Sequence, residues 1–191
     1  MMGMERLTNP YNLRKASILD IPYLYGLILQ GSSEGSFSDR HFFRNGYLKL
    51  LAMLFKLLLK PVRSVDAASE THAVMLLEFN GEQIGFIHYS KHSYADKNAC
   101  MHIEHCAIAT PYRNLGHGTW LTHWAIGMAM QDSATLTACC TKYARVMQHI
   151  FKKVRFKRTS IGYGLEMYTL AYPPSVIQES PHAEHNSTLA G

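Results

Sequence analysis

The ten residues PYRNLGHGTW, at 111–120, place Arg113, Gly116 and Gly118 in an R-x-x-G-x-G pattern directly before a long apolar stretch. Glycine has no side chain, so a ligand can closely approach the main-chain N–H groups around these positions. Where such a turn opens a helix, those N–H groups lack partners within the helix, and the helix dipole favours a negative charge beside them. The pattern therefore predicts an anion-binding loop.

The segment just before this loop, ACMHIEHCAIA, has the composition of a strand but carries ionisable side chains. Regular strand alternation would place His102, Glu104 and Cys106 on one face, with His105 on the other. Glutamate and histidine can both accept a proton from a substrate. Because charged residues are uncommon in buried strands, we expect Glu104 to be the proton acceptor and His102 to assist it. The alternative is a structural polar pair, bonded to each other or to water.

The remaining reactive side chains do not form a recognisable catalytic or metal-binding pattern. The 11 histidines include no H-E-x-x-H motif, and His102 and His105 would face opposite sides of a regular strand. Cys106 has no evident partner base that would make it a nucleophile. We therefore expect no bound metal and no covalent enzyme intermediate.

Composition indicates one folded domain that needs no disulfide bonds. The chain has 191 residues, of which 47% are hydrophobic and 17% charged. Its four cysteines form no C-x-x-C pair, which favours reduced thiols and a cytoplasmic protein. The N-terminal MMGMERLTNP lacks the apolar region of a signal peptide, and the most apolar run, 47–59, is shorter than the about 20 residues of a membrane span. We therefore expect no membrane span.

A basic block lies within residues 142–158, which carry seven Lys and Arg side chains and no acid: Lys142, Arg145, Lys152, Lys153, Arg155, Lys157 and Arg158. Such a block suits a phosphorylated ligand, an acidic surface or nucleic acid, and a solvated helix face is an equal alternative. Since no aromatic platform is interleaved with these residues, nucleic acid is not the favoured partner.

Hydrophobic periodicity and turn residues predict alternating strands and helices within one domain at 1–172. Expected strands span 11–17, 72–79, 83–90, 99–109, 135–140 and 164–172, and expected helices span 18–31, about 39–60, about 118–131 and 144–154. Asp20 is expected to cap the first helix, and Gly31 to follow its end. The last residues, 173–191, have the composition of a disordered tail.

This order of elements resembles that of the GNAT superfamily of N-acetyltransferases over roughly residues 11–172. The R-x-x-G-x-G run is similar to that family's R/Q-x-x-G-x-G/A loop, which binds the coenzyme A pyrophosphate. LRKASILDIPYLYGL resembles the opening strand and capped helix, NGEQIGFI the central hairpin, and IFKKVRF the Y-x-K-x-G-F signature. The resemblance implies an α/β fold: a mixed central sheet of about six to seven strands, with a splay between its two central parallel strands and helices on both faces.

The resemblance also implies a site and a reaction. Acetyl-CoA would lie in the splay, and an amine would attack its thioester directly. Family bases sit fourteen or twelve positions before the first loop glycine, which here are His102 and Glu104. The positions implied to contact the coenzyme are Ile108, Ala109, Thr110, Arg113, Asn114, Leu115, Gly116, His117, Gly118, Thr119 and Phe151.

Three positions depart from the family pattern. Thr110 stands where the family usually has proline, Phe151 where it has tyrosine, and Arg155 where it has glycine. That tyrosine commonly protonates the departing thiolate, so the general acid is left open between ordered water and another tyrosine, Tyr143 or Tyr163. A non-catalytic acyl-CoA-binding module is the alternative function. The acceptor, a small-molecule or protein amine, is not specified by the sequence, and an apolar second helix leaves a homodimer open.

Overall fold

The computed structural model describes residues 9–37, 46–59, 70–92, 99–162 and 165–171. The strands are β1 Tyr11–Lys15, β2 Glu70–Phe79, β3 Glu82–His92, β4 Cys100–Ile108, β5 Thr135–Thr141, β6 Lys157–Gly162 and β7 Leu165–Leu170, and the helices are α1 Ile21–Ser33, α2 Gly46–Leu59, α3 His117–Gln131 and α4 Arg145–Lys153. The order expected from the sequence is confirmed, with β6 as an additional strand. The expected tail at 173–191 and the expected helix start at 39–45 lie outside the described residues.

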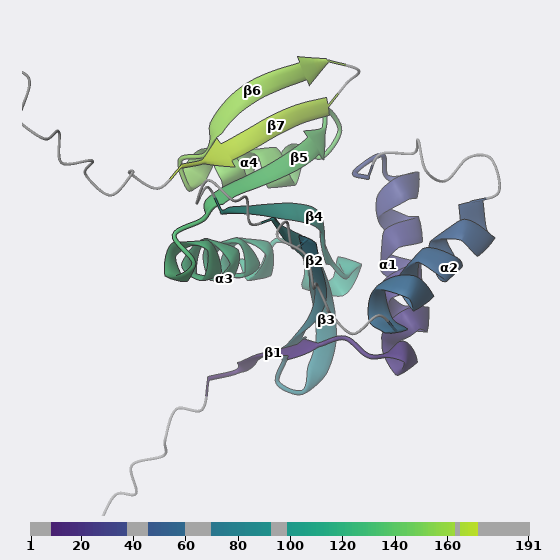
Figure 1. The fold of residues 1–191 in the computed structure, drawn as a ribbon. Coiled ribbons are helices and arrows are strands. Elements are labelled where there is room, and N and C mark those ends of the chain that lie inside the picture. The colour runs from purple at the N-terminus through teal and green to yellow at the C-terminus, as the bar shows by residue number, and fades with distance from the viewer. Residues whose placement is uncertain (1–8, 38–45, 60–69, 93–98, 163–164, 172–191) are drawn as a thin grey trace, which may run out of the picture.

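The seven strands form one sheet in the order β1-β2-β3-β4-β5-β7-β6 (Figure 1). The pair β4–β5 is parallel, whereas the other neighbours are antiparallel. Pairing between β4 and β5 runs only from Cys100↔Thr135 to Ile103↔Ala138. Beyond that point β4 follows β3 to Ile108, while β5 follows β7 to Thr141. The predicted splay between two central parallel strands is therefore present.

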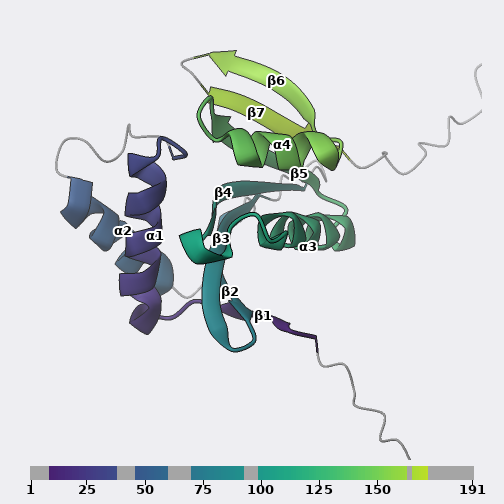
Figure 2. The same cartoon turned by 180° about the vertical axis from the view of Figure 1, so that it is seen from behind.

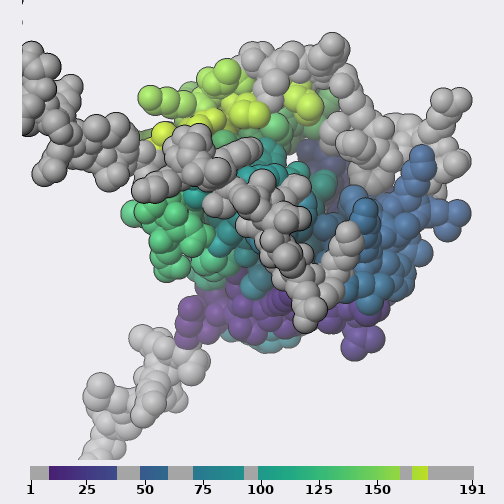
Figure 3. Space-filling view, viewed as in Figure 1, coloured from purple at the N-terminus to yellow at the C-terminus, as the bar shows by residue number. Residues whose placement is uncertain are grey.

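Helices cover both faces of the sheet, as expected (Figures 1 and 2). On one face, α3 packs against the strands through Leu121, Ala125 and Ala129. On the other, α1 and α2 pack Leu24, Ile28, Leu50 and Leu54 against Leu76 and Phe86. Figure 3 shows α3 and α2 on opposite sides of the molecule, with β6 and β7 above and β1 at the base.

The β2–β3 turn follows directly from its sequence. Asn80 and Gly81 both adopt positive φ angles, 50° and 83°. These are the two central positions of the tight hairpin turn for which Asn-Gly is strongly preferred. The turn therefore joins β2 and β3 as an antiparallel hairpin.

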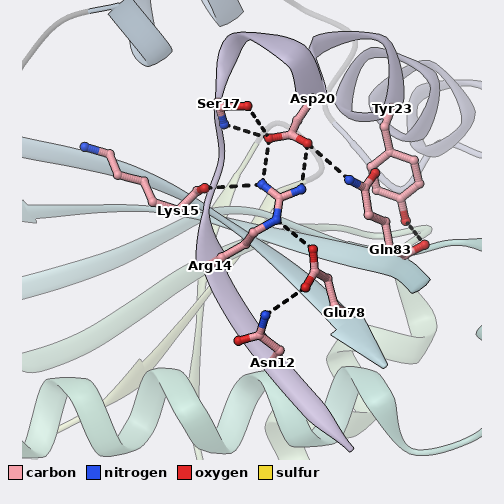
Figure 4. Close-up of polar contacts among 8 residues, drawn as sticks. All are labelled: Asn12, Arg14, Lys15, Ser17, Asp20, Tyr23, Glu78 and Gln83. Carbon is pink, nitrogen blue, oxygen red and sulfur yellow. Dashed lines mark hydrogen bonds and ion pairs between the residues drawn. The ribbon is translucent and has the colours of Figure 1, made fainter. Parts of the chain in front are cut away.

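A polar cluster joins β1 to the start of α1 (Figure 4). Asp20 occupies the N-cap position, but its carboxylate accepts hydrogen bonds from the Arg14 guanidinium at 2.8 Å and from Ser17 N–H at 2.7 Å. The bonded Arg14 holds the pKa of Asp20 well below its usual range. Arg14 also binds Glu78 of β2, so the cluster fixes the direction in which α1 leaves the sheet. The helix continues through Gly31, which was expected to follow its end, to Ser33.

Candidate active site

A cavity of about 440 Å³ occupies the splay between β4 and β5. Its walls come from the end of α1 and the following residues, from β4 and β5, from the start of α3 and from α4. The strand walls are residues 103–108 and 138–140, and the helix and loop walls are Gly31, Glu34, Ser36, Phe37, Tyr112, Arg113, Asn114, Gly116, Gly118, Thr119, 143–147, Ile150 and Phe151. The cavity thus brings the glycine loop and the carboxyl half of β4 to one place.

The glycine loop ends in a left-handed turn that opens α3. Gly116 is the N-cap residue and has φ +89°, a conformation that favours glycine. The first helical hydrogen bond runs from Trp120 N–H to the Gly116 carbonyl at 3.0 Å, so the N–H groups of residues 117–119 precede the helical ladder. At Gly118, an added Cβ would lie 3.3 Å from Ile150 Cδ1, so glycine keeps this wall of the cavity open.

Arg113 is tied to two elements at the cavity wall. Its Nε donates to the Ile108 carbonyl at 2.9 Å, and its Nη1 donates to both carboxylate oxygens of Glu34 at 2.9 Å. Both side chains are about one third exposed, 34% and 37%, so solvent screens this ion pair. An anion bound at the loop would share Arg113 with Glu34, which lies just beyond the end of α1.

Seven of the eleven positions expected to contact a coenzyme line the cavity: Ile108, Arg113, Asn114, Gly116, Gly118, Thr119 and Phe151. The other four, Ala109, Thr110, Leu115 and His117, are not part of its lining. Leu115 is exposed, and the Thr110 hydroxyl is bonded to Gln30. The His117 ring is buried, with Nδ1 2.9 Å from the Tyr11 hydroxyl, so only its main chain belongs to the loop.

A β-bulge places Glu104 at the edge of the cavity. His88 of β3 pairs with His105, and the next residue, Tyr89, pairs with Ile103, so Glu104 is the extra residue of β4. A bulge of this kind shifts the alternation of the strand beyond it. Met101 and Ile103 face the core under α3 before the bulge, and Cys106 and Ile108 face it afterwards. The expected alternation is therefore wrong beyond Glu104.

The bulge changes which side chains share the face of Glu104. His102 and Glu104 do share one face of β4, as predicted, and this face is the one toward α1. Cys106, expected beside them, packs in the opposite core, and His105, expected opposite, lies on their face. Phe37, which packs with α1, contacts the His105 ring edge-on at a centroid distance of 5.2 Å.

Glu104 lines the cavity and is half-buried. The Ser90 hydroxyl of β3 donates a hydrogen bond of 2.8 Å to its Oε1. A carboxylate that lines a cavity can accept a proton from a molecule bound there. The position predicted for the base is therefore accessible to a substrate.

His102 is held outside the cavity lining. Its Nδ1 lies 2.8 Å from Thr137 Oγ1 on β5, and the Thr137 hydroxyl donates to the Met101 carbonyl at 3.4 Å. Burial lowers the pKa of His102, against the opposing effect of the Glu104 charge. Because His102 is absent from the cavity lining, any assistance from it must pass through Glu104 or water.

His105 and His88 were not singled out from the sequence. His105 lines the cavity and stacks on His88 with ring centroids 5.5 Å apart and planes 7° apart. Their Nδ1 atoms lie 3.2 Å apart. Burial, and then the neighbouring His105, lower the pKa of His88 to about 3. A regular alternation of β4 hides this pair, since it assigns His105 to the wrong face.

His88 should make folding stability depend on pH. The pKa of an unfolded histidine is about 6.5, whereas folded His88 stays neutral down to about pH 3. Stability should therefore fall as pH falls through this window, by at most about 1.4 kcal/mol per pH unit. The free energy of unfolding, measured with urea between about pH 7 and about pH 5, should change less steeply with pH in His88→Phe than in the wild type. The exposed His123→Phe is the control, and an unchanged slope in His88→Phe would contradict the assignment.

Two of the three departures from the family pattern lie near the end of α4. Phe151 is buried, and its ring packs on Phe156 and Tyr168 with centroids 4.8 and 5.2 Å away. Arg155 adopts φ +67°, so the backbone makes the left-handed turn that glycine would favour at this position. The chain keeps the shape of this turn with a different residue.

Within the described ranges, no group of three or more His, Cys, Asp or Glu residues is arranged to hold a metal ion. No described helix combines the length and the apolar character that crossing a bilayer requires. The cysteines Cys100, Cys106, Cys139 and Cys140 are free thiols. Burial raises the pKa of Cys106 to about 12, which disfavours the thiolate that a nucleophile needs.

Comparison with known proteins identifies the fold. Solved structures with similar folds include an acetyltransferase from Thermus thermophilus, at 17% identity over 85% of this chain and 97% of that one, with a TM-score of 0.60. The PaiA N-acetyltransferase of Thermoplasma acidophilum in complex with coenzyme A matches at 16% identity, over 85% and 99% of the chains, with a TM-score of 0.62. Salmonella typhimurium yncA with its cofactor acetyl-CoA matches at 14%, over 90% and 99%, with a TM-score of 0.59.

No match was found among curated proteins. The model of the acetyltransferase (GNAT) family matches residues 41–156, which is more than half of the chain. This range includes the splayed strands, the glycine loop and α3. The chain therefore belongs to the GNAT family of acetyltransferases.

Proposed function

We propose that this protein is an acetyl-CoA-dependent N-acyltransferase in which an amine attacks the thioester directly. The observation that carries the proposal is one cavity whose lining includes both the glycine loop and Glu104. Two of the similar structures hold coenzyme A or acetyl-CoA, which supports the same donor here.

The residues around the cavity fit this donor. The N–H groups of residues 117–119 and the positive end of α3 suit a pyrophosphate, and Gly116 and Gly118 leave room for it. Arg113 adds positive charge at the same wall. Beyond Ile103, β4 has no pairing with β5, which leaves an open edge beside the cavity. Acetyl-CoA supplies the acetyl group as a thioester.

Glu104 would accept the proton of the attacking amine. A primary amine is protonated at neutral pH, so its proton must be removed before it can attack. The Glu104 carboxylate lines the cavity and would take the proton directly or through one water. His102 is not part of the lining and is bonded to Thr137. A main-chain N–H at the open edge of β4 would stabilise the oxyanion that forms at the thioester carbonyl. No covalent intermediate on the protein is needed.

Phe151 leaves the protonation of the departing thiolate to another group. Tyr143 lines the cavity mouth and is 61% exposed, and ordered water is the alternative. The third candidate, Tyr163, lies outside the described residues. Because a thiolate is a tolerable leaving group near neutral pH, a positioned acid is not essential.

Phe151→Tyr should therefore leave kcat unchanged or raise it. The added hydroxyl would stand where the family places its acid, on a ring that already lines the cavity. Steady-state rates and coenzyme affinity of both forms test this, with Tyr143→Phe as the companion variant. A large loss of rate at unchanged coenzyme affinity would mean that the phenyl ring itself has a role in turnover.

The proposal is tested by incubating the protein with acetyl-CoA and a broad amine panel, followed by measurement of free thiol release. Steady release with at least one amine supports the enzyme. Tight coenzyme binding without release for any amine would favour the alternative, a non-catalytic acyl-CoA-binding module, which Phe151 and Arg155 favour.

The free thiols of the four cysteines support a reducing compartment, the cytoplasm, as the location.

A further inference from the structure

We propose that Ser90 and His92 are positioning residues that hold the Glu104 carboxylate in the orientation and charge state needed to accept the amine proton. Both residues belong to β3, and neither lines the cavity. This inference rests on the proposed function, because it names the residues that position the general base of that reaction.

The three side chains form a continuous hydrogen-bonded chain. Ser90 is completely buried, and its Oγ donates to Glu104 Oε1 at 2.8 Å. His92, two residues further along β3 and on the same face, places Nε2 3.2 Å from Ser90 Oγ. The chain therefore leads from the cavity lining to the end of β3.

The donors and acceptors of this chain follow from its chemistry. An ionised carboxylate only accepts hydrogen bonds, so the single hydroxyl proton of Ser90 points toward Glu104. His92 must then present an N–H at Nε2 to the Ser90 oxygen, which fixes the proton position on the imidazole. Hydrogen bonds in series polarise one another, so the His92 donor strengthens the bond from Ser90 to the carboxylate.

This arrangement leaves one carboxylate oxygen for the substrate. Within the described part of the chain, Oε1 is taken by Ser90, whereas Oε2 has no hydrogen-bond partner. A hydrogen-bond donor favours the ionised form of a carboxylate, and the Ser90 hydroxyl is such a donor to Glu104. The titratable groups that face this carboxylate are His102 on its own strand, His92 on β3 and Cys139 on β5.

The bulge explains why such support is needed. As the extra residue of β4, Glu104 has no paired residue on β3 to fix its backbone. A catalytic group must be held close to its productive geometry by partners that are themselves fixed. Ser90 is paired with His102 in the regular part of the sheet and can supply that restraint.

The test uses the full chain with the best amine from the panel. Ser90→Ala should lower kcat about ten- to a hundredfold, the scale of a lost hydrogen bond to a charged group, while the KM for acetyl-CoA stays unchanged. The acid limb of the rate profile should move to higher pH, because a carboxylate without its donor is protonated more readily. When Glu104 is already replaced by glutamine, adding Ser90→Ala should lower kcat little further.

His92 offers a matched pair of variants. His92→Gln keeps an N–H donor for Ser90 and should retain most of the activity, whereas His92→Leu removes the donor and should shift the acid limb in the direction of Ser90→Ala. The exposed His123→Leu, on α3, is the control for loss of a histidine. An NMR titration of the Glu104 carboxyl should show a higher midpoint in Ser90→Ala, with or without turnover.

The outcomes separate this inference from the proposed function. The positioning role alone would be overturned by the following combination of results. Glu104→Gln is slow, but Ser90→Ala and His92→Leu keep the acid limb and the NMR midpoint of the wild type. An equal loss from Ser90→Ala in both backgrounds would also overturn it. If no amine is acetylated, the function fails, and the NMR midpoint still decides whether Ser90 holds Glu104 as a carboxylate.

Discussion

Replacing Glu104 with glutamine should lower kcat by about 10²- to 10⁴-fold, the range that general-base catalysis contributes. Glutamine keeps the size of the side chain and can still accept the hydrogen bond from Ser90. It cannot take up a proton, so only the proton transfer is lost. The coenzyme Kd should stay unchanged, because the loop before α3 is a separate part of the cavity.

The pH dependence gives this substitution a second readout. The rate of the wild-type enzyme should rise with pH along a limb that moves or vanishes in Glu104→Gln. His102→Ala should cost less, since His102 stands behind the cavity lining and is bonded to Thr137. If both residues serve one proton path, the fold-loss of rate in the double variant should be smaller than the product of the two single losses. Full activity with the same pH limb in Glu104→Gln would make Glu104 structural.

Local patterns predicted the parts of the site that depend on local backbone shape. The R-x-x-G-x-G run needs a left-handed residue before a helix, and Gly116 adopts that conformation at the start of α3. The Asn80–Gly81 turn is equally local. The family resemblance supplied the splay, which a single strand cannot reveal because it depends on where two distant strands stop pairing.

The features that the sequence did not predict arise from contacts between distant segments. The bulge at Glu104 exists only in the register between β3 and β4, so simple alternation misplaced Cys106 and His105. Glu34 meets Arg113 across 79 positions of the chain. Strand β6 begins with Lys157 and Arg158 and lies at the edge of the sheet, where charged residues are common and apolar alternation is weak.

Coenzyme binding should be most sensitive to the backbone at Gly116. With φ at +89°, this position requires a conformation that costs other L-residues roughly 1–2 kcal/mol, and more for a β-branched side chain. Gly116→Val should therefore turn the N–H groups of the loop away from the pyrophosphate and raise the Kd for coenzyme A about tenfold or more. Calorimetry on the folded variants measures this directly.

Gly127, in the middle of α3, is the matched control for this substitution. An added Cβ has no neighbour within 4 Å at either glycine, and of the two only Gly116 has a positive φ. Gly127→Val should then bind coenzyme A like the wild type, and Lys152→Ala on α4 should lose less affinity than Gly116→Val. Equal affinities of the two valine variants would show that the left-handed turn does not shape the pyrophosphate site. If the wild type does not bind coenzyme A at millimolar coenzyme concentration, the glycine loop is not a coenzyme-binding site.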